Sequence, residues 1–323
     1  MCLSHKFEQL IFNDFTESCC KKYKKIRMKK YNIFLVFIGF SFGLKAQETA
    51  PNFLGYHYNM NILNPAYAGE DGKNELNMSF RKQSLALQDD PLTQTVSYSK
   101  SLKNNLGIGI SLVNDKNYIR KQTDFGLDVS YTLLLNASTS FSFGMKVGGG
   151  IFSIDYRSLE IPNDPLFAEN QSHFSPKIGF GGLLKGRRYY LQISTPNAII
   201  DQFVKPAVDG LGNILSQGAK EKLHLYTGAG YRFTIHDNLD LTSSVFARFV
   251  SDSDTLIDVS VFADISRKIE LGMTYRRNTS FIGTAMLKII ENTYFGYAYE
   301  AVTSDFSAVS NGTHEFLIRF RFP

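Results

Sequence analysis

The stretch Asp124-Phe-Gly-Leu-Asp-Val-Ser-Tyr-Thr-Leu-Leu-Leu135 decides the fold. Apolar side chains occupy every second position from Phe125 to Leu133, and polar or small residues stand between them. Because successive side chains of a strand point to opposite faces, this alternation predicts a strand with one apolar and one polar face. Residues 136–138 form a turn, and a second alternating run follows from Phe141 to Val147. The two runs together predict an antiparallel hairpin.

Most of the remaining chain repeats this pattern. The 323 residues are 14% aromatic, include 25 Gly and no Trp, and contain few stretches of helical periodicity, which favours a single all-β unit. Fourteen strands are predicted, at 74–83, 92–102, 105–114, 122–135, 139–155, 175–185, 188–195, 222–235, 238–250, 255–265, 268–277, 279–290, 292–301 and 313–323.

The connections between these strands differ systematically in length. Those after even-numbered strands are short, at 103–104, 136–138, 186–187, 236–237, 266–267 and 291. Those after odd-numbered strands are mostly longer, at 84–91, 115–121, 156–174, 195–221, 251–254 and 302–312, with a tight turn at Asn278 as the exception. Short turns at one end and long loops at the other are typical of an outer-membrane barrel, and a soluble sandwich has no reason to separate them.

The length and polarity of the strands favour the same interpretation. A strand that crosses a bilayer needs ~9–11 residues, and most of these have that length. Backbone groups in lipid must be paired within the protein, so the sheet has to close. An apolar outer face and a polar inner face invert the arrangement of a soluble barrel. We therefore predict an all-β transmembrane antiparallel barrel of about 14 strands, with short periplasmic turns and longer extracellular loops, surrounded by outer-membrane lipid.

The first 46 residues have the features of an export signal. Met28-Lys29-Lys30 is followed by an apolar run from Ile33 to Leu44 and by a small residue, Ala46, at the expected cleavage position. The run is too short to span a bilayer as a helix, although a short N-terminal anchor helix is the alternative. The predicted organisation is a non-native upstream extension at 1–27, a signal peptide at 28–46, an irregular segment or plug at 47–73 and the barrel at 74–323.

Charge and residue types exclude several functions. Nine of the 35 basic residues but only three of the 30 acidic ones precede residue 47, so the rest of the chain is almost neutral and no nucleic-acid partner is expected. All three cysteines lie in the same leader. The histidines have no metal-binding spacing and no Gly-x-Ser-x-Gly motif is present. We expect no catalytic, metal or cofactor site; a barrel hydrolase using His224 is the enzyme alternative, and a polar lumen residue is its simpler interpretation.

Two features of the predicted inner face are open to more than one interpretation. The charges are either the lining of a selective channel or a salt-bridged lumen that holds a plug, and they comprise Asp124, Asp128, Lys146, Arg232, Arg248, Asp258, Asp264, Glu270, Arg276, Glu315 and Arg319. The Gly107-Ile108-Gly109 and Gly148-Gly149-Gly150 runs lie within strands, where glycine marks tight curvature or close approach of a plug backbone.

Several short motifs are spread over nearly the whole chain from Pro51 onward. The most specific is Asn64-Pro65-Ala66-Tyr67-Ala68-Gly69, which follows Tyr56-His57-Tyr58-Asn59, and this block resembles the start of the PorP/SprF family. The family's Arg-x-Gln-Trp and Pro-x-Thr pieces appear as Arg81-Lys82-Gln83-Ser84 and Pro91-Leu92-Thr93, with Ser84 in place of the Trp. Gly296 to Glu300 and Thr313-His314-Glu315-Phe316 resemble its closing pieces. The missing Trp indicates a divergent paralogue.

The resemblance implies an outer-membrane barrel that serves type IX secretion and gliding motility without being an enzyme. Its implied partners are secreted cargo or cell-surface adhesins, recognised through their C-terminal domains, and the periplasmic and outer-membrane components of the secretion machine. A passive channel for small solutes is the main alternative. A plugged lumen would oppose it, and a clear axial path would support it.

Overall fold

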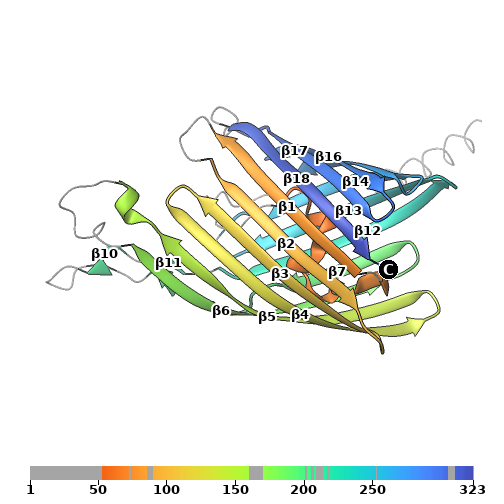
Figure 1. The fold of residues 1–323 in the computed structure, drawn as a ribbon, viewed down its shortest axis with the longest axis horizontal. Helices are drawn as coiled ribbons and strands as arrows, with labels where there is room; N and C mark the ends of the chain where they lie inside the picture. Colours follow the sequence, from red (N-terminus) through yellow and green to blue (C-terminus); the bar gives the residue numbers. More distant parts are fainter. Residues whose placement is uncertain are drawn as a thin grey trace, which may run out of the picture. The chain divides into compact units, whose positions relative to one another are not determined.

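The computed structural model describes residues 53–72, 74–85, 90–159, 170–200, 202–204, 207–208, 214–216, 219–220, 222–251, 253–304 and 310–322, all within one compact unit. The predicted extension and signal peptide lie outside these residues and stay predictions. Fourteen strands form the barrel (Figure 1): β1 (Asn74–Leu85), β2 (Leu92–Ser101), β3 (Leu106–Asn117), β4 (Arg120–Asn136), β5 (Thr139–Ile154), β6 (Gln171–Lys185), β7 (Tyr189–Thr195), β12 (His224–His236), β13 (Leu239–Val250), β14 (Leu256–Ile265), β15 (Ile269–Arg276), β16 (Ser280–Ile290), β17 (Thr293–Val302) and β18 (Ser310–Phe322).

The sheet closes on itself. Each strand pairs antiparallel with the next along the barrel, and β1 pairs with β18 from Asn74↔Phe322 to Leu85↔Ser310. Closure leaves the sheet without an edge, so every strand has a partner on both sides, as a bilayer requires. The predicted fold class and all fourteen strands are confirmed. No helix in the described part of the chain is long and apolar enough to cross a membrane.

The two ends of the barrel differ in their connections. At the short-turn end, two of the turns place consecutive residues at positive φ, Asn104–Asn105 and Ser266–Arg267, as a two-residue hairpin turn requires. The long-loop end holds the β5–β6 and β7–β12 connections. The second of these contains two small two-stranded sheets that sequence analysis missed, in which β8 (Gln202–Val204) pairs with β11 (Ala219–Lys220) and β9 (Ala207–Val208) pairs with β10 (Ile214–Ser216).

One predicted loop at the long-loop end is wrong. Residues 115–121 are not a loop, because β3 and β4 stay paired as far as Asn117↔Arg120 and leave only a tight turn, with Tyr118 at φ 54°. Polar residues are compatible with a strand here because this end of the hairpin can extend beyond the apolar belt of the barrel.

The barrel has its apolar side chains outside. On β4, Phe125, Leu127, Val129 and Tyr131 are 45–58% exposed, whereas Asp128 and Ser130 are 2% exposed. Exposed large apolar side chains continue on the outer faces of the other strands, and most of the buried polar ones face the lumen. Of the fourteen barrel strands, only β7 and β15 are shorter than ~9 residues, the length needed to span a bilayer. The apolar outer face of the barrel is therefore suited to contact with lipid and not with water.

A short irregular segment, residues 53–72, fills the middle of the lumen (Figure 1); we call it the plug. It consists of four 3-10 turns, η1 (Tyr56–Tyr58), η2 (Met60–Ile62), η3 (Pro65–Tyr67) and η4 (Glu70–Gly72). A fifth, η5 (Tyr156–Leu159), follows β5. The plug begins near Glu315, in the half of the barrel toward the long loops, and ends near Ser99, at the short-turn end. It therefore crosses most of the lumen before β1 begins.

Candidate functional site

The Asn64–Gly69 block forms η3 and its two ends. The Asn64 side chain accepts a hydrogen bond from the Ala66 N–H at 3.0 Å and so caps the turn, while Pro65, which lacks an N–H, occupies its first position. The same amide donates hydrogen bonds to the Gly182 carbonyl and to Gln192 Oε1, both at 3.3 Å. Asn64 thus fixes the shape of the turn and attaches it to β6 and β7.

Glycines on the inner wall let this block approach closely. A Cβ at Gly144 would lie 2.3 Å from the Ala66 nitrogen, and a Cβ at Gly181 would lie 2.0 Å from Asn64 Oδ1. At Gly107 the Ala68 carbonyl oxygen would be 2.0 Å away. Of the two interpretations of the Gly107–Gly109 run, close approach of the plug backbone is confirmed for Gly107, whereas a Cβ at Gly109 would first meet Asp128 of the neighbouring strand, at 3.0 Å. Gly148 to Gly150 lie instead against neighbouring barrel residues, including Phe125 and Phe174.

Wall side chains satisfy the polar backbone of the plug. Ser130 donates to the Ala68 carbonyl at 2.6 Å, and Ser194 donates to the Leu63 carbonyl at 2.9 Å. The ammonium group of Lys146, which pairs with Asp128 at 2.9 Å, also donates to the Asn61 carbonyl at 3.2 Å. The short 3-10 turns pair only part of the plug backbone with itself, so these inward side chains pair further buried carbonyl groups.

We expect Asn64→Ala to lower the free energy of unfolding by about 1–3 kcal/mol, because it removes the hydrogen-bond partner of the buried Gln192 side chain and that of the Ala66 N–H. Thermal unfolding in detergent, followed by far-ultraviolet circular dichroism, measures the change. Asn136→Ala is the matched control, since Asn136 accepts the N–H of Ser138 two residues ahead in an exposed turn. Equal losses in the two variants would contradict a special role for the buried amide.

Three other motif residues meet on three adjacent strands nearer the long loops. Glu315, Arg81 and Thr93 are register partners across β18, β1 and β2, and all three are buried. The Glu315 carboxylate accepts hydrogen bonds from the N–H groups of Leu54 and Gly55 at 2.7 and 3.2 Å, so it holds the start of the plug. The position of Arg81 beside it places a positive charge next to a carboxylate that is 1% exposed.

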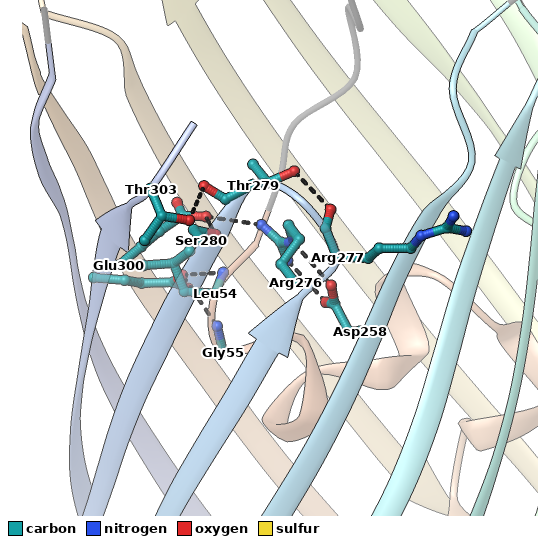
Figure 2. Close-up of polar contacts among 10 residues, drawn as sticks. Leu54, Gly55, Asp258, Arg276, Arg277, Thr279, Ser280, Glu300 and Thr303 are labelled. Atoms are coloured by element: carbon teal, nitrogen blue, oxygen red, sulfur yellow. Dashed lines mark hydrogen bonds and ion pairs between the residues drawn. The ribbon is translucent and has the colours of Figure 1, made fainter. Parts of the chain in front are cut away.

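A second buried charge cluster lies beside this row. Arg276 donates to both oxygens of Asp258 at 2.9 Å and to Glu300 at 3.1 Å (Figure 2). Ser280 donates a further hydrogen bond to Glu300 at 2.6 Å. The bidentate geometry matches the planar guanidinium to a carboxylate and gives two acids one shared cation. For these residues the salt-bridged lumen is the better of the two interpretations of the inward charges.

Aromatic contacts fix the rest of η1. Tyr56 stacks on Phe246 with ring centroids 4.6 Å apart, and His57 stacks on Phe262 at 4.2 Å. Arg319 lies over the Tyr58 ring and donates to the Tyr58 carbonyl at 2.5 Å. Burial lowers the pKa of the His57 imidazole by disfavouring its protonated form, against the opposing effect of Glu270.

Not every predicted motif residue faces the plug. His314 lies on the outer face, where Nδ1 is 2.7 Å from the Tyr297 hydroxyl, although its neighbour Glu315 points inward. The carbonyl of Pro91 accepts the Gln83 N–H at 3.0 Å and joins the ends of β1 and β2. Sequence analysis missed Gln192, Ser194 and Tyr226, which contact the plug or its cavity; their inward positions in predicted strands were the available signal.

The plug lies between two cavities. The outer cavity, of about 150 Å³, is toward the long loops and is lined by residues such as Phe53, Gln122 and His224. The inner cavity, of about 640 Å³, is toward the short turns and is lined by residues such as His57, Glu270 and Arg321. Ile62 and Leu63 line the outer cavity, and Met60 and Asn61 line the inner one. The turn η2 therefore separates the two cavities. His224 is thus a lumen residue, as its simpler interpretation predicted.

Comparison with known structures supports the fold. The CymD monoaromatic hydrocarbon channel is 11% identical, with a TM-score of 0.51, and the match covers 81% of this chain and 92% of that one. The Pseudomonas putida toluene transporter TodX is 9% identical, with a TM-score of 0.50, covering 81% and 93%. At this identity the likeness concerns the fold alone. None of the curated proteins matches the chain.

A family match extends over almost the same part of the chain as the sequence motifs. Residues 45–320 match the family described as type IX secretion system membrane protein PorP/SprF. The match includes the whole plug and all of the barrel up to Phe320, with the Asn64–Gly69 block on the glycine-lined wall and Glu315 at the other end of the plug. The chain belongs to the PorP/SprF family of type IX secretion membrane proteins and has the fold of an outer-membrane barrel.

Proposed function

We propose that this protein is a non-enzymatic accessory of type IX secretion that binds an exported protein at the cell surface. The family supports a role in that system, and the plugged lumen carries the choice of binding over conduction. Family-motif residues such as Asn64 and Glu315 are used to hold the plug in place. Because the plug occupies the lumen, partners would contact the protein at the two ends of the barrel.

The two ends suit different partners. In outer-membrane barrels short turns face the periplasm, so the short-turn end would meet the periplasmic components of the secretion machine. The inner cavity at that end presents charges of both signs, including Glu75, Asp240, Arg232 and Arg321. The long-loop end would hold the C-terminal domain of a secreted cargo or adhesin outside the cell.

Affinity capture from detergent-solubilised outer membranes tests this proposal. One version of the protein carries its tag in the exposed 136–138 turn, at the short-turn end, and the other carries it in the turn at Asn278, at the opposite end. An antibody should reach only the second tag on intact cells. We expect mass spectrometry to find type IX components and a large protein with a C-terminal sorting domain, and a tag to interfere with the partner at its own end.

A passive channel is the second candidate, and the observation that favours it is the pair of cavities facing the two ends of the barrel. The similar CymD and TodX structures are named as a channel and a transporter. Recordings in planar bilayers decide between the two. If the protein is an accessory, the purified protein should show no conductance steps. Steady conductance, together with no captured partners, would instead support the channel function.

A further inference from the structure

The outer cavity has the size of a small ligand group. Its volume of about 150 Å³ equals that of an engineered protein cavity that binds benzene. Part of its lining comes from the plug, through Phe53, Ile62 and Leu63, and part from the barrel wall, through Val113 and Phe152. These apolar side chains offer water few hydrogen bonds, so an apolar group of ring size fits this part of the cavity.

The charged residues around this cavity are mainly basic. Four basic side chains and a single carboxylate line it, namely Arg120, Lys146, Lys177, Lys222 and Asp124. Lys177 pairs with Asp124 at 2.8 Å, and Lys146 pairs with Asp128 beneath the cavity. The inner cavity differs, because its lining contains five acidic residues beside six Lys and Arg. The excess of basic over acidic side chains is therefore larger in the outer cavity than in the inner one.

Two of the four cations lie at the long-loop end of the outer cavity. Arg120 begins β4 at the long-loop end, and Lys222 precedes β12 at the same end, where its ammonium donates to Ser253 at 2.8 Å. Ile62 and Leu63 of the plug pack with Val113 of β3 in one buried apolar cluster, farther from that end. A ligand that enters from the long-loop end would bury its apolar group first and keep an anionic group near these cations.

We propose that the outer cavity binds a carboxylate attached to an apolar group of about ring size. This chemistry is shared by a free cyclic or branched carboxylic acid and by the C-terminal residue of a peptide that ends in a large apolar side chain. The site does not depend on the secretion role, since it follows from the shape and charge of the lumen alone.

A single tryptophan provides the readout, because the natural chain has none. Phe152→Trp places the indole in the outer cavity, and Tyr294→Trp places it in the inner cavity as a control. The probes are 3-cyclohexylpropanoate and its uncharged amide. We expect the acid to shift the emission of the first variant in a saturable way, at least tenfold more tightly than the amide, with no saturable shift in the second.

Further substitutions in the Phe152→Trp background test the two parts of the site. Lys222→Met and Arg120→Met should each weaken binding of the acid severalfold, whereas Lys288→Met, in the inner cavity, should not. Val113→Phe should abolish binding by filling the outer cavity. If Val113→Phe fails to fold, Ser175→Leu is the substitute variant that fills the same cavity. Unchanged binding in a folded, filled variant would overturn the proposal.

Two peptides identify the source of the carboxylate. Gly-Gly-Leu with a free C-terminus should bind and its C-terminal amide should not if the site takes a polypeptide end. Binding of 3-cyclohexylpropanoate alone would assign the site to free acids. Both results support the shared chemistry. Equal binding of the acid and its amide, or no binding of either acid or peptide at 10 mM, would reject it.

Discussion

Replacing Arg276 with Met is expected to lower the free energy of unfolding of the barrel by about 3–5 kcal/mol. Arg276 is 2% exposed and is the cation that both Asp258 and Glu300 contact, at 2.9 and 3.1 Å. Its removal leaves two carboxylates next to each other in a site with little access to water. An uncompensated buried charge costs far more than the original ion pair contributes. Urea unfolding in lipid vesicles, followed by circular dichroism, measures the loss.

Two comparisons separate this effect from the loss of a side chain. Lys82→Met removes an ion pair of similar length, 3.2 Å to Asp90, but the Lys82 side chain is 54% exposed, so the expected cost is below about 1 kcal/mol. Adding Asp258→Asn and Glu300→Gln to Arg276→Met should restore most of the stability, because the orphaned charges are then neutral. If Arg276→Met alone were as stable as Lys82→Met, the result would show that water reaches Asp258 and Glu300.

The barrel itself could be predicted because its determinants are local. Alternation of side chains within a strand and the length of the following connection are properties of short stretches, and both survive in the structure from β1 to β18. The wrong loop at 115–121 has the same origin. Polar residues between two apolar runs predict a loop, yet a hairpin such as β3–β4 can continue with polar residues beyond the apolar belt.

The plug could not be placed by the same reasoning. Its 3-10 turns have no sustained period, and its partners come from strands far away in the chain, as with Asn64 and Gln192. Only the register of the closed barrel brings Glu315, Arg81 and Thr93 into one row. His314 and Glu315 show the limit of a motif, because neighbours in a strand must face opposite sides. The motif located the important segments but did not assign a function to each side chain.

Gly144→Ala is expected to have the largest effect on permeability, because it should displace the plug and turn a silent barrel into a conducting one. The added Cβ would lie 2.3 Å from both the Ala66 nitrogen and the Pro65 carbonyl carbon, which are backbone atoms and cannot rotate away. Overpacking of this kind typically costs about 1–3 kcal/mol, and movement of η3 away from β5 relieves it. Single-channel recording in planar bilayers measures the conductance, and limited proteolysis measures exposure of residues 53–72.

Gly283→Ala is the matched control for Gly144→Ala, since Gly283 faces outward from β16 and a Cβ there would meet no atom within 4 Å. If only the Gly144 variant conducts, the plug is the barrier, and the wild-type barrel acts through its two ends rather than through its lumen. If the Gly144 variant also loses its captured partners, the position of the plug controls the binding surface. Equal conductance in the wild type and both variants would mean that ions already pass beside η2, and the channel would then be the better function for this fold.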